Sequence, residues 1–373
     1  MLVSCDCVYD TTSLISFIQK EKAQKRFSVK PRYVSIPSHT VSVKAVRWKA
    51  KVRRWISVFV HGQEGGKMPE LTNDNLSMIV CCHKECVLPT MTCLLPVRGG
   101  SLIADGEIQM QRDDRLGSDV CDNISAKNGS FCELTAIYWA WKNLRTMRPN
   151  THYVGVNHYR RYFYTGESRN VPNVVVKSER QVDDYVINID VFADALKKSD
   201  VIISRKEHTK NSLYHRYCQY HMSDDIRMLV CVLHELHPEF DQAVCDVLFR
   251  SNAFSPYNMF VMQWSWFDEY CAWLFEVLFE LERRIDISAY NRLQRRIYGY
   301  MGERLLNVWL HWKQARKHEL PVVFFGDTVQ ANPLKERILN AEFDARFRMV
   351  RDTKKSAQGL HGFIVRDWPS LID

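Results

Sequence analysis

Short apolar runs that end in polar clusters recur along the middle of the chain. The clearest runs span residues 76–82, 153–156 and 200–204. Weaker runs of the same type span residues 94–97, 257–262 and 322–325. Short apolar runs bounded by polar residues are typical of strands buried in a parallel sheet. We therefore expect these segments to form one sheet, with residues 322–325 as an added edge strand.

Apolar residues at helical spacing lie between these runs. Leu134, Ile137 and Trp141 recur at intervals of three and four within residues 130–145, which predicts a helix. Trp141 belongs to its core face, and Trp139 is expected to line a cleft or to pack beneath it. Further helices are predicted at 190–198, 228–237 and 264–281, with a last one that starts at Glu303. Helices that alternate with strands indicate an α/β fold.

Polar side chains follow the two clearest strands. They are His83, Lys84, Asn157, His158, Arg160 and Arg161. Ligands of open α/β sheets bind at the carboxyl ends of strands, and guanidinium groups suit phosphate oxygens. We expect a phosphate site here, with only one of the two arginines facing it because neighbouring residues alternate. Two alternatives remain. His83 could simply hydrogen-bond to the backbone at the strand end, and one of the two arginines could form an ordinary ion pair.

A polar loop precedes the first predicted helix. Asp122, Asn123, Lys127 and Asn128 supply a carboxylate, two amides and an ammonium group, which suit a ribose or a diphosphate. Ser125 or Asn128 could also serve as an ordinary helix N-cap. The loop holds more polar groups than a cap needs, so ligand binding is the favoured interpretation.

Aromatic and polar residues mix in a later segment. The candidates for an acceptor-sugar surface are Tyr214, His215, His221 and Asp224, together with Asn258 in the 257–262 run. Aromatic rings pack on the apolar faces of sugars, and polar groups hold the hydroxyls. The two histidines have no carboxylate spacing that would indicate a metal.

Consecutive blocks of the sequence carry a family resemblance. They are Asp122-Asn-Ile-Ser-x-Lys-Asn128, Cys132-Glu-Leu-Thr135 with Tyr138-Trp-x-Trp-Lys-Asn143, His158-Tyr-Arg-Arg-Tyr-Phe163, and a last block at 298–309. These blocks resemble a bacterial glycosyltransferase family long catalogued as a domain of unknown function (DUF4422) and found in capsule and O-antigen synthesis. The resemblance runs from about residue 76 to about residue 313.

The resemblance implies a GT-A-like (Rossmann-like) mixed sheet flanked by helices and a nucleotide-sugar donor. In inverting enzymes of that class, an acidic residue near a helix start deprotonates the acceptor hydroxyl. Glu303, at the start of the last predicted helix, corresponds to this residue. A helix start also favours a carboxylate electrostatically and would lower its pKa. Arg160, Arg161 and Lys127 would offset the charge of the leaving diphosphate. The implied product is a capsular, O-antigen or related surface glycan, with a free or lipid-linked glycan as acceptor.

Two further hypotheses stay open. Many GT-A enzymes hold Mg²⁺ or Mn²⁺ through an Asp-x-Asp motif, which is missing after residues 153–156, so a divalent metal would need Asp119 or Asp122 instead. Cys82-His83-x-x-Cys86 resembles only half of a metal site, and no metal ligand is predicted. From another class, the chain could be a non-catalytic nucleotide- or glycan-binding module of a polysaccharide assembly complex.

Charge separates the first residues from the rest. Residues 1–70 hold 8 Lys and 5 Arg against 2 Asp and 3 Glu, which accounts for the net charge of +8 of the whole chain. We expect residues 1–75 to be a basic extension, either poorly ordered or in peripheral contact with anionic lipid through residues 20–54. Residues 76–320 form the transferase domain and 321–373 an appendage.

Composition and the start of the chain bear on its location. A hydrophobic fraction of 46% with 25% charged residues is ordinary for a globular protein. Residues 1–9 lack the features of a signal peptide, so we expect a cytoplasmic protein with reduced cysteines, peripheral at most to the inner face of the plasma membrane. The basic residues lack a stacking motif for nucleic acid.

Overall fold

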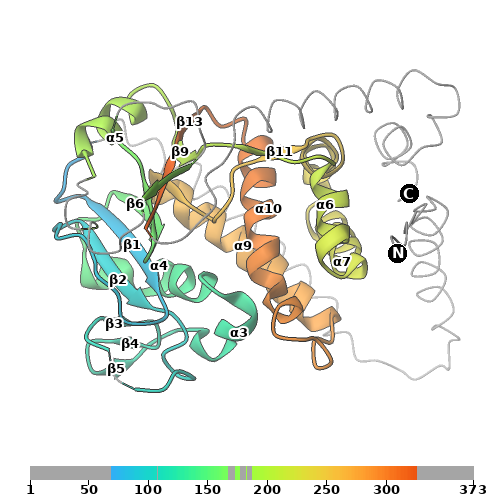
Figure 1. The fold of residues 1–373 in the computed structure, drawn as a ribbon, viewed down its shortest axis with the longest axis horizontal. Helices are drawn as coiled ribbons and strands as arrows, with labels where there is room; N and C mark the ends of the chain where they lie inside the picture. The colour runs from blue at the N-terminus through green and yellow to red at the C-terminus, as the bar shows by residue number, and fades with distance from the viewer. Residues whose placement is uncertain (1–68, 107, 167–172, 177–181, 183–186, 326–373) are drawn as a thin grey trace, which may run out of the picture. The chain divides into compact units, whose positions relative to one another are not determined.

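The computed structural model describes residues 69–106, 108–166, 173–176, 182 and 187–325. The predictions for residues 1–68 and 326–373, including lipid contact through residues 20–54, lie outside this range. The described residues build a mixed sheet with helices packed around it (Figure 1).

Ten strands make up this sheet. The path runs β13-β9-β12-β6-β1-β2-β3, and β7, β14 and β8 extend from β6. Their bounds are β1 (Leu76–Cys82), β2 (Leu94–Arg98), β3 (Gln111–Arg112), β6 (Tyr153–His158), β7 (Arg161–Phe163), β8 (Asn173–Val176), β9 (Val201–Ser204), β12 (Phe260–Gln263), β13 (Lys317–Leu320) and β14 (Val322–Phe325). Two short ribbons, β4 (Arg115–Leu116) with β5 (Asp119–Val120) and β10 (Glu207–His208) with β11 (Ala253–Phe254), lie apart from it.

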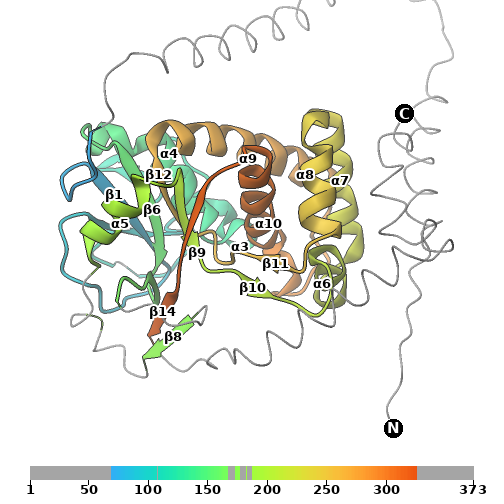
Figure 2. The ribbon, with the colours of Figure 1, turned by 90° about the horizontal axis from the view of Figure 1, so that it is seen from above.

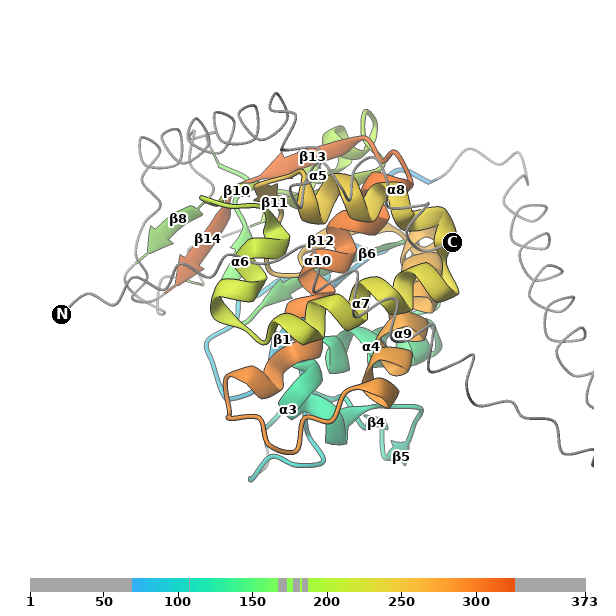
Figure 3. The same cartoon turned by 90° about the vertical axis from the view of Figure 1, so that its right-hand side faces the viewer.

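The helices divide into those on the sheet and those beyond. The main ones are α3 (Asn128–Phe131), α4 (Leu134–Met147), α5 (Ile189–Leu196), α6 (Leu213–Tyr220), α7 (Ser223–Leu236), α8 (Asp241–Val244), α9 (Trp264–Arg284) and α10 (Ile297–Trp312). Figures 1 and 2 show α9 and α10 between the sheet and the group α6 to α8. Figure 3 views the molecule from that group, with α6 and α7 in front of α10.

Alternation along β1 explains the burial of both sheet faces. Met78 and Val80 point to one face and join an apolar cluster that includes Phe192 of α5. Ile79 and Cys81 point to the other face, where α4 packs. Every residue of β1 is buried, because helices and loops cover both faces.

Strand direction gathers the ends of distant segments at one edge. β2 and β6 run parallel to β1, so Cys82, Arg98 and His158 end at the same edge. β12 runs antiparallel to both β6 and β9. It therefore begins where its neighbours end, which brings Tyr257 and Asn258 to this edge as well.

Three details differ from the sequence expectations. The predicted helix at 130–145 is broken, because Cys132 has a φ of +52° and separates α3 from α4. α10 begins at Ile297, so Glu303 lies inside the helix and not at its start. Residues 322–325, expected as an edge strand, form β14, which is paired on both sides, with β7 and with β8.

One of the two tryptophans of α4, Trp141, also differs from its expected place in the core. Trp139 is fully buried and its indole nitrogen donates to the Arg115 carbonyl at 2.9 Å. Trp141 is partly exposed and donates to Asp268 at 2.7 Å while it stacks on Phe275. The apolar spacing located the helix but not the rotation of its faces.

Candidate functional site

A basic cluster lies at the ends of β1 and β6. β6 and β7 pair through His158 and Arg161, so Tyr159 and Arg160 form the loop of the hairpin. The rings of His83 and Tyr159 meet edge to face at 4.9 Å. Lys84 and Arg160 both lie over the Tyr159 ring, at 5.6 and 4.9 Å from its centre.

A third cation completes this basic cluster. Burial lowers the pKa of His83, and the positive charges of Lys84, Arg160 and Arg296 lower it further. Arg296 ends the short helix η5 (Gln294–Arg296), and its Nε donates to Cys132 Sγ at 3.3 Å. Lys84, Arg160 and Arg296, which we call the basic cluster, therefore share the space around His83. Three positive charges in one place favour a multiply charged anion such as a diphosphate.

Arg161 takes a different direction from Arg160. Its guanidinium lies between the rings of Tyr257 and Phe324, at 5.1 and 5.0 Å. The expectation that only one arginine would join the phosphate site agrees with this separation. Burial and the charge of Arg161 lower the pKa of His158 to about 3, so its ring is neutral, and Nε2 donates to the Tyr257 carbonyl at 2.6 Å.

An acidic cluster, Glu133, Glu207 and Glu303, surrounds the Tyr257–Asn258 dipeptide. The Tyr257 N–H donates to Glu303 Oε1 at 3.1 Å, and the Tyr257 hydroxyl donates to Glu207 Oε1 at 2.6 Å. Asn258 Nδ2 donates to Glu133 Oε1 at 2.7 Å. Tyr257 and Asn258 both have positive φ, +76° and +52°. Non-glycine residues in this conformation store strain, which is concentrated at functional sites in proteins.

Burial raises the pKa of two of these carboxyl groups, Glu133 and Glu303. The pKa of Glu303 is raised to about 7, chiefly by burial and also by the charges of Glu133 and Glu207, while Arg304 and the Tyr257 N–H oppose the rise. Burial raises the pKa of Glu133 too, while the Asn258 side chain and the charges of Arg296 and Arg161 lower it. The predicted helix-start lowering of the Glu303 pKa is therefore wrong, because the residue lies inside α10. A carboxyl with a pKa near 7 suits general base catalysis at neutral pH.

Two glycines let α10 approach this cluster. A Cβ on Gly299 would lie 3.1 Å from Cys132, and one on Gly302 would lie 3.0 Å from Leu134 and 3.3 Å from Asn258 Nδ2. Gly299 and Gly302 are three residues apart and share one face of the helix. The break at Cys132 can therefore pack directly on the backbone of α10. Gly302 thus lies inside the helix and permits close packing there.

The 122–128 loop is bound internally. Asp122 accepts a hydrogen bond from the Tyr138 hydroxyl at 3.0 Å, and Asn123 bonds within its own turn. Asn128 donates to the Cys132 carbonyl at 2.8 Å and lies against Gly100. Lys127 pairs with Glu282 of α9 at 2.5 Å, away from Arg160. The structure thus gives each of these four predicted donor-site residues a structural partner and replaces Lys127 by Arg296 in the basic cluster.

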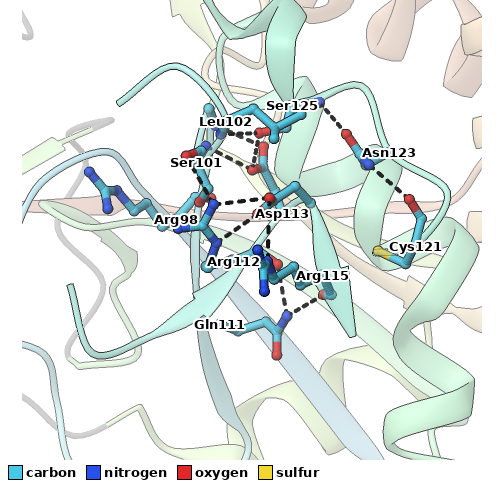
Figure 4. Close-up of polar contacts among 12 residues, drawn as sticks. Arg98, Ser101, Leu102, Gln111, Arg112, Asp113, Arg115, Cys121, Asn123 and Ser125 are labelled. Carbon is cyan, nitrogen blue, oxygen red and sulfur yellow. Dashed lines mark hydrogen bonds and ion pairs between the residues drawn. The ribbon is translucent and has the colours of Figure 1, made fainter. Parts of the chain in front are cut away.

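A buried carboxylate that the sequence did not reveal holds this loop to β2. Asp113 accepts bonds from the backbone N–H groups of Gly100 and Ser101 and from the Ser125 hydroxyl, at 2.7, 3.0 and 2.5 Å (Figure 4). Ser125 is thus a cross-link between loops and not a helix cap. Asp113 is fully buried and fully bonded, which makes it a structural residue.

Asn157 lies apart from its neighbour His158. It pairs in register with Val80 on β1, whereas His158 pairs with Cys81. Alternation therefore puts Asn157 on the opposite sheet face from His158. Both of its amide atoms are buried without a partner among the described residues.

The predicted acceptor residues divide into two groups. Asn258 lies in the acidic cluster, and His221 stacks on Tyr300 of α10 at 4.2 Å. Tyr214 is buried against Phe249, and His215 bonds the Ser212 hydroxyl that caps α6. Asp224 is exposed and pairs with Arg227 at the start of α7. Tyr214, His215 and Asp224 thus support α6 and α7.

Four residues of the site were not predicted from the sequence: Glu133, Glu207, Tyr257 and Arg296. Glu133 stands in a quoted block, but the predicted helix ran through it. Glu207 and Arg296 follow predicted elements at no recognisable spacing. Only tertiary contacts bring them together, so the sequence contained no local signal for their role.

The residues do not fit a protein-held divalent cation. Arginines stand where an Asp-x-Asp motif would lie, Asp122 is bonded to Tyr138, and Asp119 lies in the exposed β4–β5 ribbon. Within the described part of the chain, no group of three or more His, Cys, Asp or Glu side chains could hold a metal. No helix among the described residues is long and apolar enough to cross a membrane.

The mixed sheet with flanking helices confirms the predicted GT-A-like α/β fold class. Residues 77–315 match the family described as domain of unknown function (DUF4422), and the chain belongs to this family. The fold is similar to that of WbbM, a bifunctional glycosyltransferase solved in its apo form, with a TM-score of 0.58 and 26% identity over 68% of this chain and 46% of that one. The chain spans less than half the length of WbbM. No curated protein matches the sequence.

Proposed function

We propose that this protein transfers a glycosyl group from a nucleotide sugar to a hydroxyl of a glycan. One observation carries the proposal: the basic cluster and the buried carboxyl of Glu303 lie at one edge of the sheet, connected through His158 and Tyr257. The basic cluster suits a diphosphate, and the Glu303 carboxyl suits the deprotonation of an acceptor hydroxyl. Similarity to a glycosyltransferase supports the same class of reaction.

The proposed step is a direct displacement. The ionised Glu303 carboxylate accepts the proton of the acceptor hydroxyl, and that oxygen forms a bond to the anomeric carbon. The bond between the anomeric carbon and the diphosphate oxygen breaks, and its electron pair leaves with the diphosphate. The basic cluster, Lys84, Arg160 and Arg296, offsets the charge that develops there. Attack from the face opposite the leaving group inverts the anomeric configuration.

We further propose a capsular, O-antigen or related surface glycan, free or lipid-linked, as the acceptor. This proposal is supported by the family resemblance alone. The protein's own cations take the place of a metal in the proposed mechanism. The alternative, Mg²⁺ or Mn²⁺ that arrives with the diphosphate, predicts loss of transfer in the presence of a chelator.

Thermal unfolding with UDP, GDP and dTDP tests the proposal. A ligand that binds only the folded form raises the unfolding temperature, so one of these nucleotides should stabilise the protein. Arg160→Ala should weaken the shift, because Arg160 belongs to the basic cluster. Transfer from a panel of UDP-, GDP- and dTDP-sugars then tests catalysis. Stabilisation without transfer or donor hydrolysis would favour a non-catalytic binding module instead.

A further inference from the structure

Glu133 is a partly buried carboxylate that the displacement does not use. It lies between α3 and α4, just after the break at Cys132. Asn258 Nδ2 donates to its Oε1 at 2.7 Å, and no other side chain among the described residues donates to it. Arg161 and Arg296 act on its pKa, but neither forms an ion pair with it in the described part of the chain. A carboxylate taken out of water usually gains more partners than this.

Asn258 provides a second, independent sign of a ligand. The residue is 1% exposed, and its Oδ1 is buried without a partner in the described structure. Nearly all buried side-chain amides are fully engaged. Its φ of +52° is a strained backbone conformation, which adds to the cost of the unpaired Oδ1. The fold thus holds Asn258 in a costly conformation in which its amide nitrogen contacts Glu133 and, at 3.5 Å, the Gly299 carbonyl.

The same dipeptide holds both Glu133 and Glu303. Tyr257 holds Glu303 through its backbone N–H, and the next residue, Asn258, holds Glu133 through its side chain. Two consecutive residues therefore position the two carboxyl groups at the same place in the fold. The charge of Glu133 also contributes to the raised pKa of Glu303.

We propose that Glu133 and Glu303 bind neighbouring hydroxyl groups of the acceptor sugar. Glu303 accepts the proton of the reacting hydroxyl, and Glu133 accepts a hydrogen bond from the hydroxyl beside it. The ligand class is therefore a sugar with two adjacent hydroxyls, one of them the attacking group. This inference rests on the proposed function, because it assigns the acceptor part of that site.

The surrounding charges set a pH signature for the pair. The groups that act on Glu303 are Arg304 on its own helix, Glu207 of β10, Glu133 and the Tyr257 N–H. Replacement of Glu133 by glutamine removes one negative charge from this set. The pKa of Glu303 should then fall, and the acidic limb of the rate profile should move to lower pH.

Saturation-transfer NMR with methyl glycosides of common hexoses tests the pair directly. Wild-type protein should bind at least one glycoside, and a deoxy analogue that lacks one of two adjacent hydroxyls should bind less. Glu133→Gln should weaken binding about tenfold, the size expected for a hydrogen bond to a charged group. Glu280→Gln is the matched control, because Glu280 lies in surface ion pairs with Arg283 and Arg284 on α9.

The outcomes separate this inference from the proposed function. Suppose that a nucleoside diphosphate stabilises wild type and Glu133→Gln alike. If wild type then binds no glycoside, or if the variant binds glycosides as tightly as wild type does, the inference is wrong and the proposed function stands. If neither the nucleoside diphosphate nor any glycoside binds wild type, the inference and the proposed function are both wrong. Loss of diphosphate stabilisation in Glu133→Gln would instead put Glu133 on the donor side and overturn the acceptor assignment.

Discussion

At the scale of single residues, burial outweighs helix position in setting the chemistry of Glu303. A carboxylate at the start of a helix gains from the dipole and becomes a weaker base. Glu303 lies inside α10, its side chain is only 22% exposed, and its pKa rises to about 7. Arg304, whose Nη1 lies 3.8 Å from Oε2, and the Tyr257 N–H stabilise its charge. This balance leaves the group able to accept a proton near neutral pH.

Glu303→Gln should lower the rate of transfer by about 10²–10⁴-fold, because general base catalysis contributes this much. In wild type the base form exists only above its pKa, so kcat/KM should rise with pH through about 7 and then level off. The profile of kcat/KM against pH measures both effects. A glutamine variant that keeps wild-type turnover would remove Glu303 from the mechanism. Nucleotide-induced stabilisation should persist in the variant and shows that it is folded.

Arg296→Ala should weaken nucleoside diphosphate binding by about tenfold or more, the loss expected for a charge-assisted hydrogen bond. Its positive charge acts at His83, beside Lys84 and Arg160. Arg292→Ala is the control, since Arg292 is an exposed arginine of the same loop. Isothermal titration with the nucleotide found by thermal shift measures the difference. Equal losses in both variants would indicate a general charge effect and no specific contact.

At the scale of elements, apolar runs located the strands well, but the ends of elements depended on tertiary contacts. The run at 153–156 predicted β6, which continues to His158 because β1 and β7 pair with its last residues. The helix at 130–145 was predicted without a break, because nothing in the spacing of its apolar residues marks Cys132. Cys132 has a positive φ and packs against Gly299 of α10, a contact that no local pattern shows.

Gly302→Ala tests that helix contact. The added methyl group would lie 3.0 Å from Leu134 and 3.3 Å from Asn258 Nδ2, so these side chains must move. We expect the free energy of unfolding to fall by about 1–3 kcal/mol, as for other overpacked sites, and transfer activity to fall with it.

Gly129→Ala in α3 is the matched control for the Gly302 variant. No atom lies within 4 Å of the added Cβ at Gly129. Better helix propensity should leave the stability unchanged or raise it by up to about 1 kcal/mol. Urea unfolding of both variants measures the two free energies. Equal stability of the two variants would contradict the close approach of α10 to Leu134 and Asn258.

At the scale of the whole molecule, sheet topology explains which half of the site was predictable. Residues that follow β1 and β6 could be grouped from sequence, because parallel strands end at one edge. Glu133, Glu207 and Arg296 join them from a helix break, a short ribbon and the loop before α10. Their meeting depends on the antiparallel direction of β12 and on the glycines of α10. Neither feature has a signature in one sequence.

The raised pKa of Glu303 links the site to the stability of the whole chain. The folded form holds this proton up to about pH 7, whereas the unfolded chain releases it near the ordinary value of 4.5. The folded form therefore binds more protons in this window, and the free energy of unfolding falls as pH rises through it.

Glu303→Gln cannot titrate, so its stability relative to wild type should increase by about 1–3 kcal/mol between about pH 4.5 and 8. His158, whose low pKa destabilises the fold in acid, is present in both proteins and cancels in the difference. Urea unfolding of both proteins at several pH values measures this difference. A difference that stays flat would mean that Glu303 is ionised in the folded protein throughout, and a proton acceptor with a pKa near 7 would then be absent from the site.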